Sequence, residues 1–395
     1  MPPGLPHHGW MDKFPEMTKV REAYAADPVL RDRVDTSMGT EFSRAGTNFC
    51  WILAQHVIEP LVAASRSYLF DEIAFDRIYR DFETKFRAMH LHMIEFRAFN
   101  GFDSTEDPFL LPDGLILQRM TDSQLSVAIY NNAVPRLDGG AVNNAHVHRY
   151  DQWALMTTHE YPVIAGDHQI DTPRPALFPV LDEPAARLVT ALRLVCGGSG
   201  IATRSMFAQA DDEFPFVPSG TAILTAFTGA DNDRPTILLS TAADTVRNVY
   251  TALGLPEVQA DKSLQVAIRR LVFAGSRNLD NDRLVDLMTS AEALFLKRTN
   301  QNTTAKAAPV AQAAAALLAS DPELGTDGTH LERFMKMAYR ARNAEMHGDD
   351  QPYAPLHRLS GAPTSSLAHV VADAERIMRR AISAVLHQHA AWPIA

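Results

Sequence analysis

The chain of 395 residues has 37 Lys and Arg against 47 Asp and Glu, a net charge of −10, and it is 46% hydrophobic and 21% charged. This composition is typical of a folded globular protein and excludes an intrinsically disordered chain. The acidic balance argues against a protein that coats nucleic acid through bulk electrostatics. The length predicts two domains.

The sequence gives no indication of export or membrane insertion. No apolar run is long enough to span a bilayer, so we expect no membrane contact. The first residues, MPPGLPHHGW, have neither the basic start nor the apolar segment of a secretory signal. The two cysteines, Cys50 and Cys196, are too few for a disulfide framework or a thiolate metal cluster. We therefore expect a cytoplasmic protein.

Residues 1–255 have the pattern of a mixed α and β region. Apolar residues recur every three or four positions in NFCWILAQHVIEPLVAA from Asn48 and in FDRIYRDFETKFRAM from Phe75, which predicts helices. Thr121 or Asp122 is a candidate N-cap for a further helix. Another helix pattern lies at residues 183–195, and strand patterns lie at residues 115–120, 153–157 and 236–239.

From Asp261 onward the pattern is helical, and the charge is different. This part has 16 Lys and Arg against 14 Asp and Glu, near +2, whereas the remainder, with 21 against 33, is near −12. A site in this part can bind a phosphate backbone locally, although no basic tract predicts an extended surface for nucleic acid.

Five helical stretches joined by short connections predict a bundle over residues 261–391. They are KSLQVAIRRLVFAG, DNDRLVDLMTSAEALFLK, residues 305–319, THLERFMKMAYRARNAEMHG and TSSLAHVVADAERIMRRAISAVLHQHA. The predicted fold class is therefore α+β, with an N-terminal mixed α/β region at residues 1–255 followed by a C-terminal all-α helical bundle.

An arginine interrupts the apolar face of the fourth predicted helix. Apolar side chains form one stripe along that helix, and at about 100° per residue Arg342 falls in the middle of it. The stripe consists of Leu331, Phe334, Met335 and Ala338. A charged group there either extends outward past the core or faces an anion in a cleft or subunit interface.

His347 lies in the final turn of the same helix, before Gly348 and about 140° further round than Arg342. The helix dipole favours a protonated histidine at this end. The two side chains can converge on a ligand that lies across the terminus. Arginine and histidine are common near helix C-termini for electrostatic reasons, however, so the spacing alone favours an ordinary helix end.

The segment from Asp261 to Leu386 resembles the ApeA-like branch of the HEPN domains (higher eukaryotes and prokaryotes nucleotide-binding). The resemblance rests on RNLDNDRLVDLMTSAEALFL, YRARNAEMHG and AERIMRRAISAV, in this order. The family's motif is an arginine, a polar residue directly after it and a histidine a few positions later, which Arg342, Asn343 and His347 match. The stretches LLPDGLILQRMTDSQL and ARLVTALRLVCGGSG are similar to the N-terminal half that often precedes such a domain.

The resemblance implies a bundle that dimerises, with two motifs at one composite cleft, and a metal-independent ribonuclease that needs no cofactor. RNA supplies its own nucleophile, the 2′-hydroxyl, so the protein must supply proton transfer and charge stabilisation. His347 would act as general acid or base, Arg342 would bind the scissile phosphate and Asn343 would orient one of them. The expected products are a 2′,3′-cyclic phosphate and a 5′-hydroxyl, and a role in bacterial defence or stress response is implied.

Two neighbours of the motif are candidate substrate-binding residues. Arg340 also satisfies the loose spacing to His347, but Asn343 directly after Arg342 favours Arg342 as the motif residue. Arg340 lies about 160° from Arg342 around the helix and is expected to be solvated or to contact phosphate. Tyr339 occupies a flanking position of the motif and is expected on the substrate side.

Other polar groups fit structural roles better. His90 with His92 and His146 with His148 lack nearby cysteines or a clear acidic partner, so we expect no metal site. Asp282, Asp286 and Glu292 fall on a predicted helix and favour capping and hydrogen bonds within the bundle. Arg380 and His387 lack the motif's polar neighbour and are expected at the surface.

Three functions remain open from the sequence. The first is a homodimeric ribonuclease whose N-terminal region senses a ligand or restrains the nuclease. The second is a non-catalytic module that holds a nucleotide or an RNA end. The third is a dimerisation scaffold without a ligand, which predicts that Arg342 packs against a carboxylate.

Overall fold

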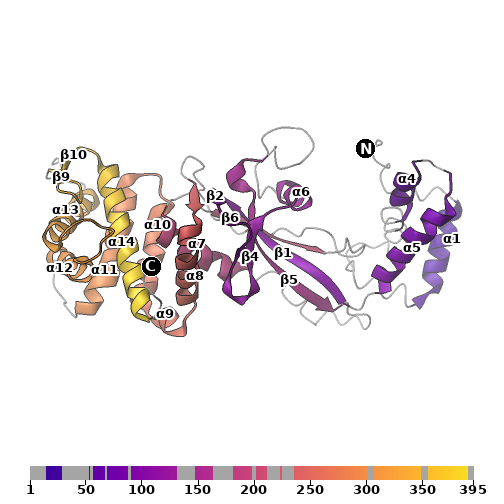
Figure 1. The fold of residues 1–395 in the computed structure, drawn as a ribbon, viewed down its shortest axis with the longest axis horizontal. Helices are drawn as coiled ribbons and strands as arrows, with labels where there is room; N and C mark the ends of the chain where they lie inside the picture. Colours follow the sequence, from indigo (N-terminus) through magenta and orange to yellow (C-terminus); the bar gives the residue numbers. More distant parts are fainter. Residues whose placement is uncertain are drawn as a thin grey trace. The chain divides into compact units, whose positions relative to one another are not determined.

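The computed structural model describes most of the chain, including most of its C-terminal half (Figure 1). The described residues are 15–28, 53, 57–66, 69–87, 90–130, 147–162, 181–197, 202–210, 223–224, 235–299, 306–347 and 355–389. Helices and strands alternate in the first part, and the part after Asp261 is almost wholly helical. The predicted α+β content with a helical C-terminal region is therefore confirmed.

The described residues belong to two compact units. One is drawn from Met1–Phe96, Thr157–Pro179 and Met206–Ile223, and the other from Arg97–Met156, Val180–Ser205 and Leu224–Ala395. The second unit extends on both sides of residues 255–261, so the domain boundary predicted there stays a prediction.

The described helices of the first unit are α1 (Pro15–Ala26), α4 (Glu59–Ser65) and α5 (Glu72–Arg87). α5 confirms the helix predicted from Phe75. Three of its aromatic side chains lie along one side: Phe75 is stacked on Tyr79 at 5.5 Å between ring centroids, and Tyr79 contacts Phe82 at 6.2 Å. About half of the stretch from Asn48 lies outside the described residues, and α4 covers its last part.

Among the described residues, six strands form one sheet in the order β3-β4-β5-β1-β6-β7. They are β1 (His90–Asn100), β3 (Phe109–Leu110), β4 (Ile116–Arg119), β5 (Trp153–Pro162), β6 (Ala202–Ala210) and β7 (Ile223–Leu224). β4 runs antiparallel to β5, with Leu117 opposite Leu155, and both side chains are fully buried. The strands predicted at 115–120 and 153–157 are confirmed.

Short elements connect this sheet to the helices. β2 (Phe102–Ser104) pairs in parallel with β8 (Thr236–Leu238), which confirms the strand predicted at 236–239. The turns η3 (Pro112–Gly114) and η5 (Arg149–Asp151) lie beside β4 and β5 in the chain. α6 (Asp122–Tyr130) begins after Thr121, whose hydroxyl accepts from the Gln124 N–H at 3.3 Å while its own N–H donates to Gln124 Oε1 at 2.9 Å. This reciprocal cap confirms Thr121 as the N-cap.

All five helices predicted after Asp261 are present. Besides α6, the described α-helices of the second unit are α7 (Asp182–Cys196), α8 (Ser240–Leu253), α9 (Pro256–Ala260), α10 (Lys262–Gly275), α11 (Asp280–Thr299), α12 (Ala307–Leu318), α13 (Gly328–His347) and α14 (Leu367–His389). α14, yellow in Figure 1, packs against α10 to α13 and also against α7, α8 and α9. Helices from before the predicted boundary therefore belong to the same packed layer as the bundle.

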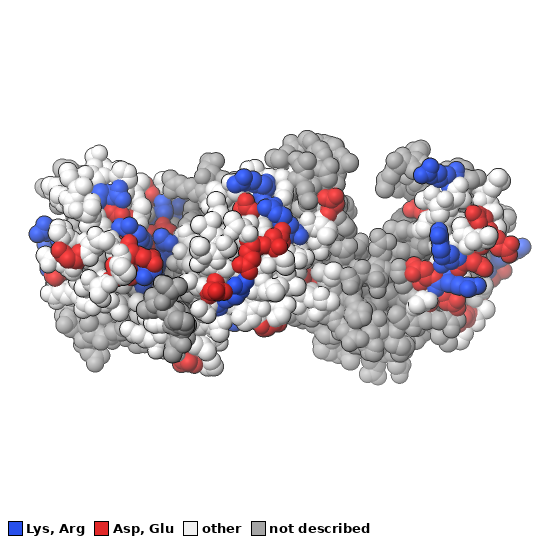
Figure 2. Space-filling view, viewed as in Figure 1, with Lys and Arg blue, Asp and Glu red and all other residues white. Residues whose placement is uncertain are grey.

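Charged side chains are mixed on the visible surface. On the face drawn in Figure 2, Lys and Arg alternate with Asp and Glu over the described residues and do not gather into one basic tract. In the part of the chain that the structure describes, no helix has the length and apolar character needed to cross a membrane.

A buried carboxylate fastens the connection between α13 and α14. This connection contains the hairpin β9 (Leu356–His357) and β10 (Pro363–Thr364). Asp373 on α14 accepts from Arg358 Nε at 2.7 Å, from Arg358 Nη2 at 3.0 Å and from the Leu359 N–H at 2.9 Å. Burial alone raises the pKa of the Asp373 carboxyl, but the hydrogen bonds from Arg358 and Leu359 outweigh it and hold that pKa below its usual range.

The Asp373→Asn variant is expected to lower the free energy of unfolding by about 2–4 kcal/mol near neutral pH, because it leaves Arg358 without its buried partner. A carboxyl whose pKa is lower in the folded state stabilises the fold above its unfolded pKa of about 4. This contribution is lost as the pH falls through the folded pKa, so the difference between variant and wild type should shrink in acid. Denaturant unfolding at several pH values measures it.

The matched control is Asp244→Asn, which removes a 92% exposed carboxylate from its ion pair with Arg247. Exposed pairs contribute little, so this variant should stay within about 1 kcal/mol of wild type. Equal losses for the two variants would contradict the role assigned to Asp373.

Candidate active site

Helix α13 places the predicted motif at its C-terminal end. Asp327 precedes the helix and accepts from the His330 N–H at 2.8 Å, which satisfies one of the free donors of the first turn. The predicted stripe of Leu331, Phe334, Met335 and Ala338 is buried, with 0–3% of each residue exposed. Arg342 continues this stripe, as the sequence predicted, and its side chain is 17% exposed.

The anion that faces Arg342 comes from the same chain. Glu292 on α11 has a side chain that is also 17% exposed, and its Oε1 lies 3.2 Å from Arg342 Nη2. Tyr339 Oη donates to the same oxygen at 2.6 Å, and Lys306 Nζ donates to Oε2 at 3.2 Å. Of the two environments predicted for Arg342, the structure shows an anion within the bundle, and no second surface is needed to offset its charge.

The guanidinium of Arg342 has further contacts and spare donors. Its Nη1 donates to Asn343 Oδ1 at 3.0 Å, and its central carbon lies 5.4 Å from the centroid of the Tyr339 ring. Nε is buried and has no hydrogen-bond partner among the described residues. An arginine has five N–H donors, and these contacts use two of them. Among the described residues, nothing else contacts the remaining donors on Nη1 and Nη2, which are therefore left for a ligand.

Tyr339 is a buried hydrogen-bond donor, with 4% of the residue exposed. Burial raises the pKa of Tyr339 to about 12, and the hydrogen bond to Glu292 and the negative charge of Glu292 act in the same direction, while Arg342 opposes them. The phenol therefore stays protonated near neutral pH. Its hydroxyl serves Glu292, and its predicted role in substrate binding stays a prediction.

The last turn of α13 lies at the surface. Arg340 is exposed, as expected. Glu345 is exposed and accepts from Asn281 Nδ2 on α11 at 2.7 Å, which ties the end of α13 to the start of α11. His347 is the final residue of the helix, but its side chain lies outside the described part of the structure, as does Gly348. The structure thus brings Arg342 and Asn343 together and shows only the backbone of His347.

The carboxylates of α11 have the structural partners that the sequence favoured. Asp286 accepts from Arg270 Nη1 at 2.8 Å and from Arg277 Nε at 2.9 Å, and Glu292 has the contacts described above. Asp282 is exposed in the first turn of the helix. The intra-bundle role predicted for Asp286 and Glu292 is confirmed.

Of the other candidate histidines and arginines, the structure describes some and leaves others outside the described residues. His90 and His92 lie on β1, but their side chains, and the whole of His146, fall outside the described residues. Among the residues that the structure does describe, no group of three His, Cys, Asp or Glu is arranged to hold a metal ion. Arg380, expected at the surface, is instead 29% exposed and pairs with Asp321 and Glu323, each at 2.8 Å.

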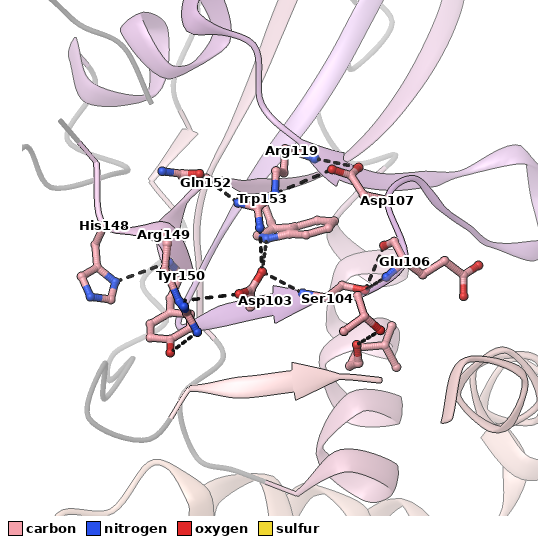
Figure 3. A network of polar contacts seen from close by, with 12 residues as sticks. Asp103, Ser104, Glu106, Asp107, Arg119, His148, Arg149, Tyr150, Gln152 and Trp153 are labelled. Carbon is pink, nitrogen blue, oxygen red and sulfur yellow. Dashed lines mark hydrogen bonds and ion pairs between the residues drawn. The ribbon is translucent and has the colours of Figure 1, made fainter. Parts of the chain in front are cut away.

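A second polar cluster, centred on Asp103, was not predicted (Figure 3). Asp103 Oδ1 accepts from Arg119 Nη2 at 2.8 Å and from Trp153 Nε1 at 3.3 Å. Arg119 also donates to Gln152 Oε1 at 2.9 Å and lies over the Trp153 ring. Arg149 Nε is 3.7 Å from Asp103 Oδ2. These groups face one another and join β2 to β4 and β5, which is a structural role.

Comparisons of the chain with models of protein families, with curated proteins and with solved structures found no match in any of the three. The functional assignment therefore rests on the residues and geometry of the chain itself.

Proposed function

We propose that this protein is a metal-independent endoribonuclease of the HEPN type, with its site at the C-terminal end of α13. The observation that carries the proposal is the placement of Arg342. A half-buried guanidinium is held by Glu292, touches Asn343 and has donors that no described residue uses, five residues before His347. Such a group is suited to bind a phosphodiester and to stabilise the charge that develops on it.

The proposed reaction uses the substrate's own nucleophile. The 2′-oxygen attacks the neighbouring phosphorus, a bond from that oxygen to phosphorus forms and the bond from phosphorus to the 5′-oxygen breaks. One proton leaves the 2′-hydroxyl and another is delivered to the 5′-oxygen, and His347 supplies one of these transfers. Arg342 binds the phosphate, and Asn343 orients Arg342. The products are a 2′,3′-cyclic phosphate and a 5′-hydroxyl.

We further propose a homodimer through the bundle, in which two copies of His347 divide the two proton transfers. In support of this surface, Leu279 and Met346 are 66% and 59% exposed, and each lies within two residues in sequence of the contact between Asn281 on α11 and Glu345 on α13. RNA is the assigned substrate, with Arg340 as a further phosphate contact. The N-terminal α+β region would sense a ligand or restrain the nuclease in the bacterial cytoplasm, in anti-phage defence or a stress response.

One observation favours a different function. The ion pair between Arg342 and Glu292 is what a ligand-free dimerisation scaffold predicts, because the arginine then serves packing alone. A non-catalytic module that holds RNA would use the spare donors of Arg342 without cleavage. The three functions differ in what they do to RNA.

Purified protein is expected to cleave a mixed pool of RNA in the presence of EDTA, because the proposed mechanism relies on His347 and Arg342 for proton transfer and charge stabilisation. Gel analysis of the RNA after incubation measures cleavage, and a filter-binding assay measures association. Binding without cleavage would favour the module that holds RNA. Neither binding nor cleavage would favour the scaffold, and cleavage that requires added magnesium would contradict the mechanism.

A further inference from the structure

Glu292 links the motif arginine to two other segments of the bundle. Its Oε1 accepts from Tyr339 Oη at 2.6 Å and faces Arg342 Nη2 at 3.2 Å, and its Oε2 accepts from Lys306 Nζ at 3.2 Å. Lys306 lies at the start of α12, so one carboxylate joins α11, α12 and α13. The proposed reaction gives this carboxylate no task of its own.

The contacts fix the direction in which the arginine points. Arginine has a long side chain with many rotamers, and a guanidinium is useful to a reacting phosphate only in one orientation. Glu292 is itself held on both oxygens, by the protonated Tyr339 hydroxyl on one side and by Lys306 on the other. A carboxylate fixed in this way holds Nη2 of Arg342 in place.

The cluster of Arg342, Lys306 and Glu292 has a net positive charge, which favours the binding of a phosphate. Arg342 and Lys306 carry two positive charges against the one negative charge of Glu292. The excess of one positive charge equals the charge of a single phosphodiester. The carboxylate nevertheless lowers the local positive potential, because it lies 3.2 Å from both cations.

We infer that Glu292 is a positioning residue of the proposed site, which fixes the guanidinium of Arg342 for turnover and weakens the binding of phosphate in doing so. This inference rests on the proposed function. It predicts that Glu292 raises the turnover of RNA and lowers the affinity for RNA. A residue that only stabilises the fold does not act on these two quantities in opposite directions.

The Glu292→Gln variant is expected to bind RNA more tightly and to cleave it more slowly. Removing the negative charge raises the potential around Arg342, so the dissociation constant for a 2′-O-methyl oligonucleotide, which has no free 2′-hydroxyl to attack, should fall about threefold or more. The freed guanidinium is less well oriented, so turnover at saturating RNA should fall by about tenfold to a hundredfold. Fluorescence anisotropy and single-turnover cleavage measure the two quantities.

The matched control is Asp286→Asn. Asp286 lies six residues earlier on the same helix, is also a paired carboxylate and is only 3% exposed, but its partners are Arg270 and Arg277. This variant should lower the unfolding temperature and leave both the dissociation constant and the turnover near wild type. The same opposite changes in Asp286→Asn would overturn the inference, since they would then follow from any lost carboxylate of α11.

A second variant, Glu292→Asp, tests the same inference if Glu292→Gln folds poorly. Glu292→Asp preserves the charge but withdraws the carboxylate by one methylene, so turnover should fall while the affinity for the 2′-O-methyl oligonucleotide stays unchanged. Turnover at the wild-type rate in Glu292→Asp would argue that the position of the carboxylate does not matter.

The binding measurement separates this inference from the proposed function. In an Arg342→Ala background, Glu292→Gln should no longer tighten binding, because its effect acts through the arginine. If wild-type protein binds RNA without cleaving it, the ribonuclease proposal fails, and Arg342-dependent tightening would still support the control of Arg342 by Glu292. If wild-type protein cleaves RNA and Glu292→Gln changes neither quantity, the inference fails alone.

Discussion

The Arg342→Ala and His347→Ala variants are each expected to lower the rate of RNA cleavage by about a hundredfold or more while the fold stays intact. Loss of a general acid or base typically costs about a hundredfold to ten-thousandfold, and loss of a group that stabilises developing charge costs a similar amount. His347 is the last residue of α13, and the helical repeat puts this position about 140° round the helix from Arg342, off the predicted apolar stripe. Its removal therefore costs little core packing.

Removal of Arg342 leaves a carboxylate that is still satisfied. Glu292 keeps the hydroxyl of Tyr339 and the ammonium of Lys306 as partners, so no bare charge is buried. Circular dichroism and the unfolding temperature check that the variants are folded before their single-turnover rates are compared with wild type.

Arg340→Ala is the matched control for Arg342→Ala. It removes the same side chain two residues earlier on the same helix, from an exposed position. We expect a smaller effect, confined to binding, because an exposed arginine that contacts phosphate adds affinity more than turnover. A His347→Ala variant that cleaves at the wild-type rate would refute the catalytic assignment and favour the module that holds RNA.

The helices of the C-terminal part could be predicted closely because each carries its own start or stop in the sequence. α10 begins after Asp261, whose carboxylate accepts from the N–H groups of Ser263 and Leu264 at 3.0 and 3.1 Å. α13 ends one residue before Gly348 in the sequence. These start and stop signals depend only on residues within one helical turn of the helix end.

Strand β1 could not be predicted because its surroundings are set by distant residues. Apolar and polar residues alternate over residues 94–98, but residues 95–100 are all buried, so this alternation does not separate a core face from a solvent face. Arg97 is 1% exposed, which its sequence neighbours do not explain, and its partner is Asp182 on α7. The local sequence does not show that Arg97 is paired with a residue 85 positions away, so it does not show that the polar positions of this strand are buried.

The site could be predicted only in part, because the sequence shows where Arg342 falls on its own helix but not which residues of other helices surround it. The helical phase of Arg342 left two environments open, extension past the core or an anion in a cleft or subunit interface, and the structure shows an anion of the same chain, Glu292. The sequence offered Asp282, Asp286 and Glu292 on the predicted partner helix without showing which one faces Arg342. Only the packing of α11 against α13 selects Glu292 and adds Tyr339 and Lys306 to the cluster.

A large loss of cleavage is also expected from a change in the substrate rather than in the protein. In the proposed reaction the nucleophile is the 2′-hydroxyl at the scissile position, so an RNA with a single 2′-deoxy sugar there lacks the attacking group. Cleavage of this substrate should fall to the background level. Arg342 still contacts the same phosphate, so the affinity of the protein for this deoxy-substituted RNA should change little. The all-ribose parent is the control.

Cleavage of the all-ribose parent should also depend on pH in the range from about 5 to 8, where histidine changes its charge and arginine does not. A metal ion that generates the nucleophile from water would remove the need for the 2′-hydroxyl. The two mechanisms therefore differ most at the deoxy position.

The most direct test of the site on α13 is single-turnover cleavage, in EDTA, of the all-ribose RNA and of its singly deoxy-substituted partner, with the ends of the products identified by mass spectrometry. The proposed mechanism predicts cleavage of the first, with a 2′,3′-cyclic phosphate and a 5′-hydroxyl, and survival of the second. Cleavage of the deoxy substrate at an undiminished rate, or activity that is lost in EDTA and restored by magnesium, would contradict the account even if the protein is a nuclease.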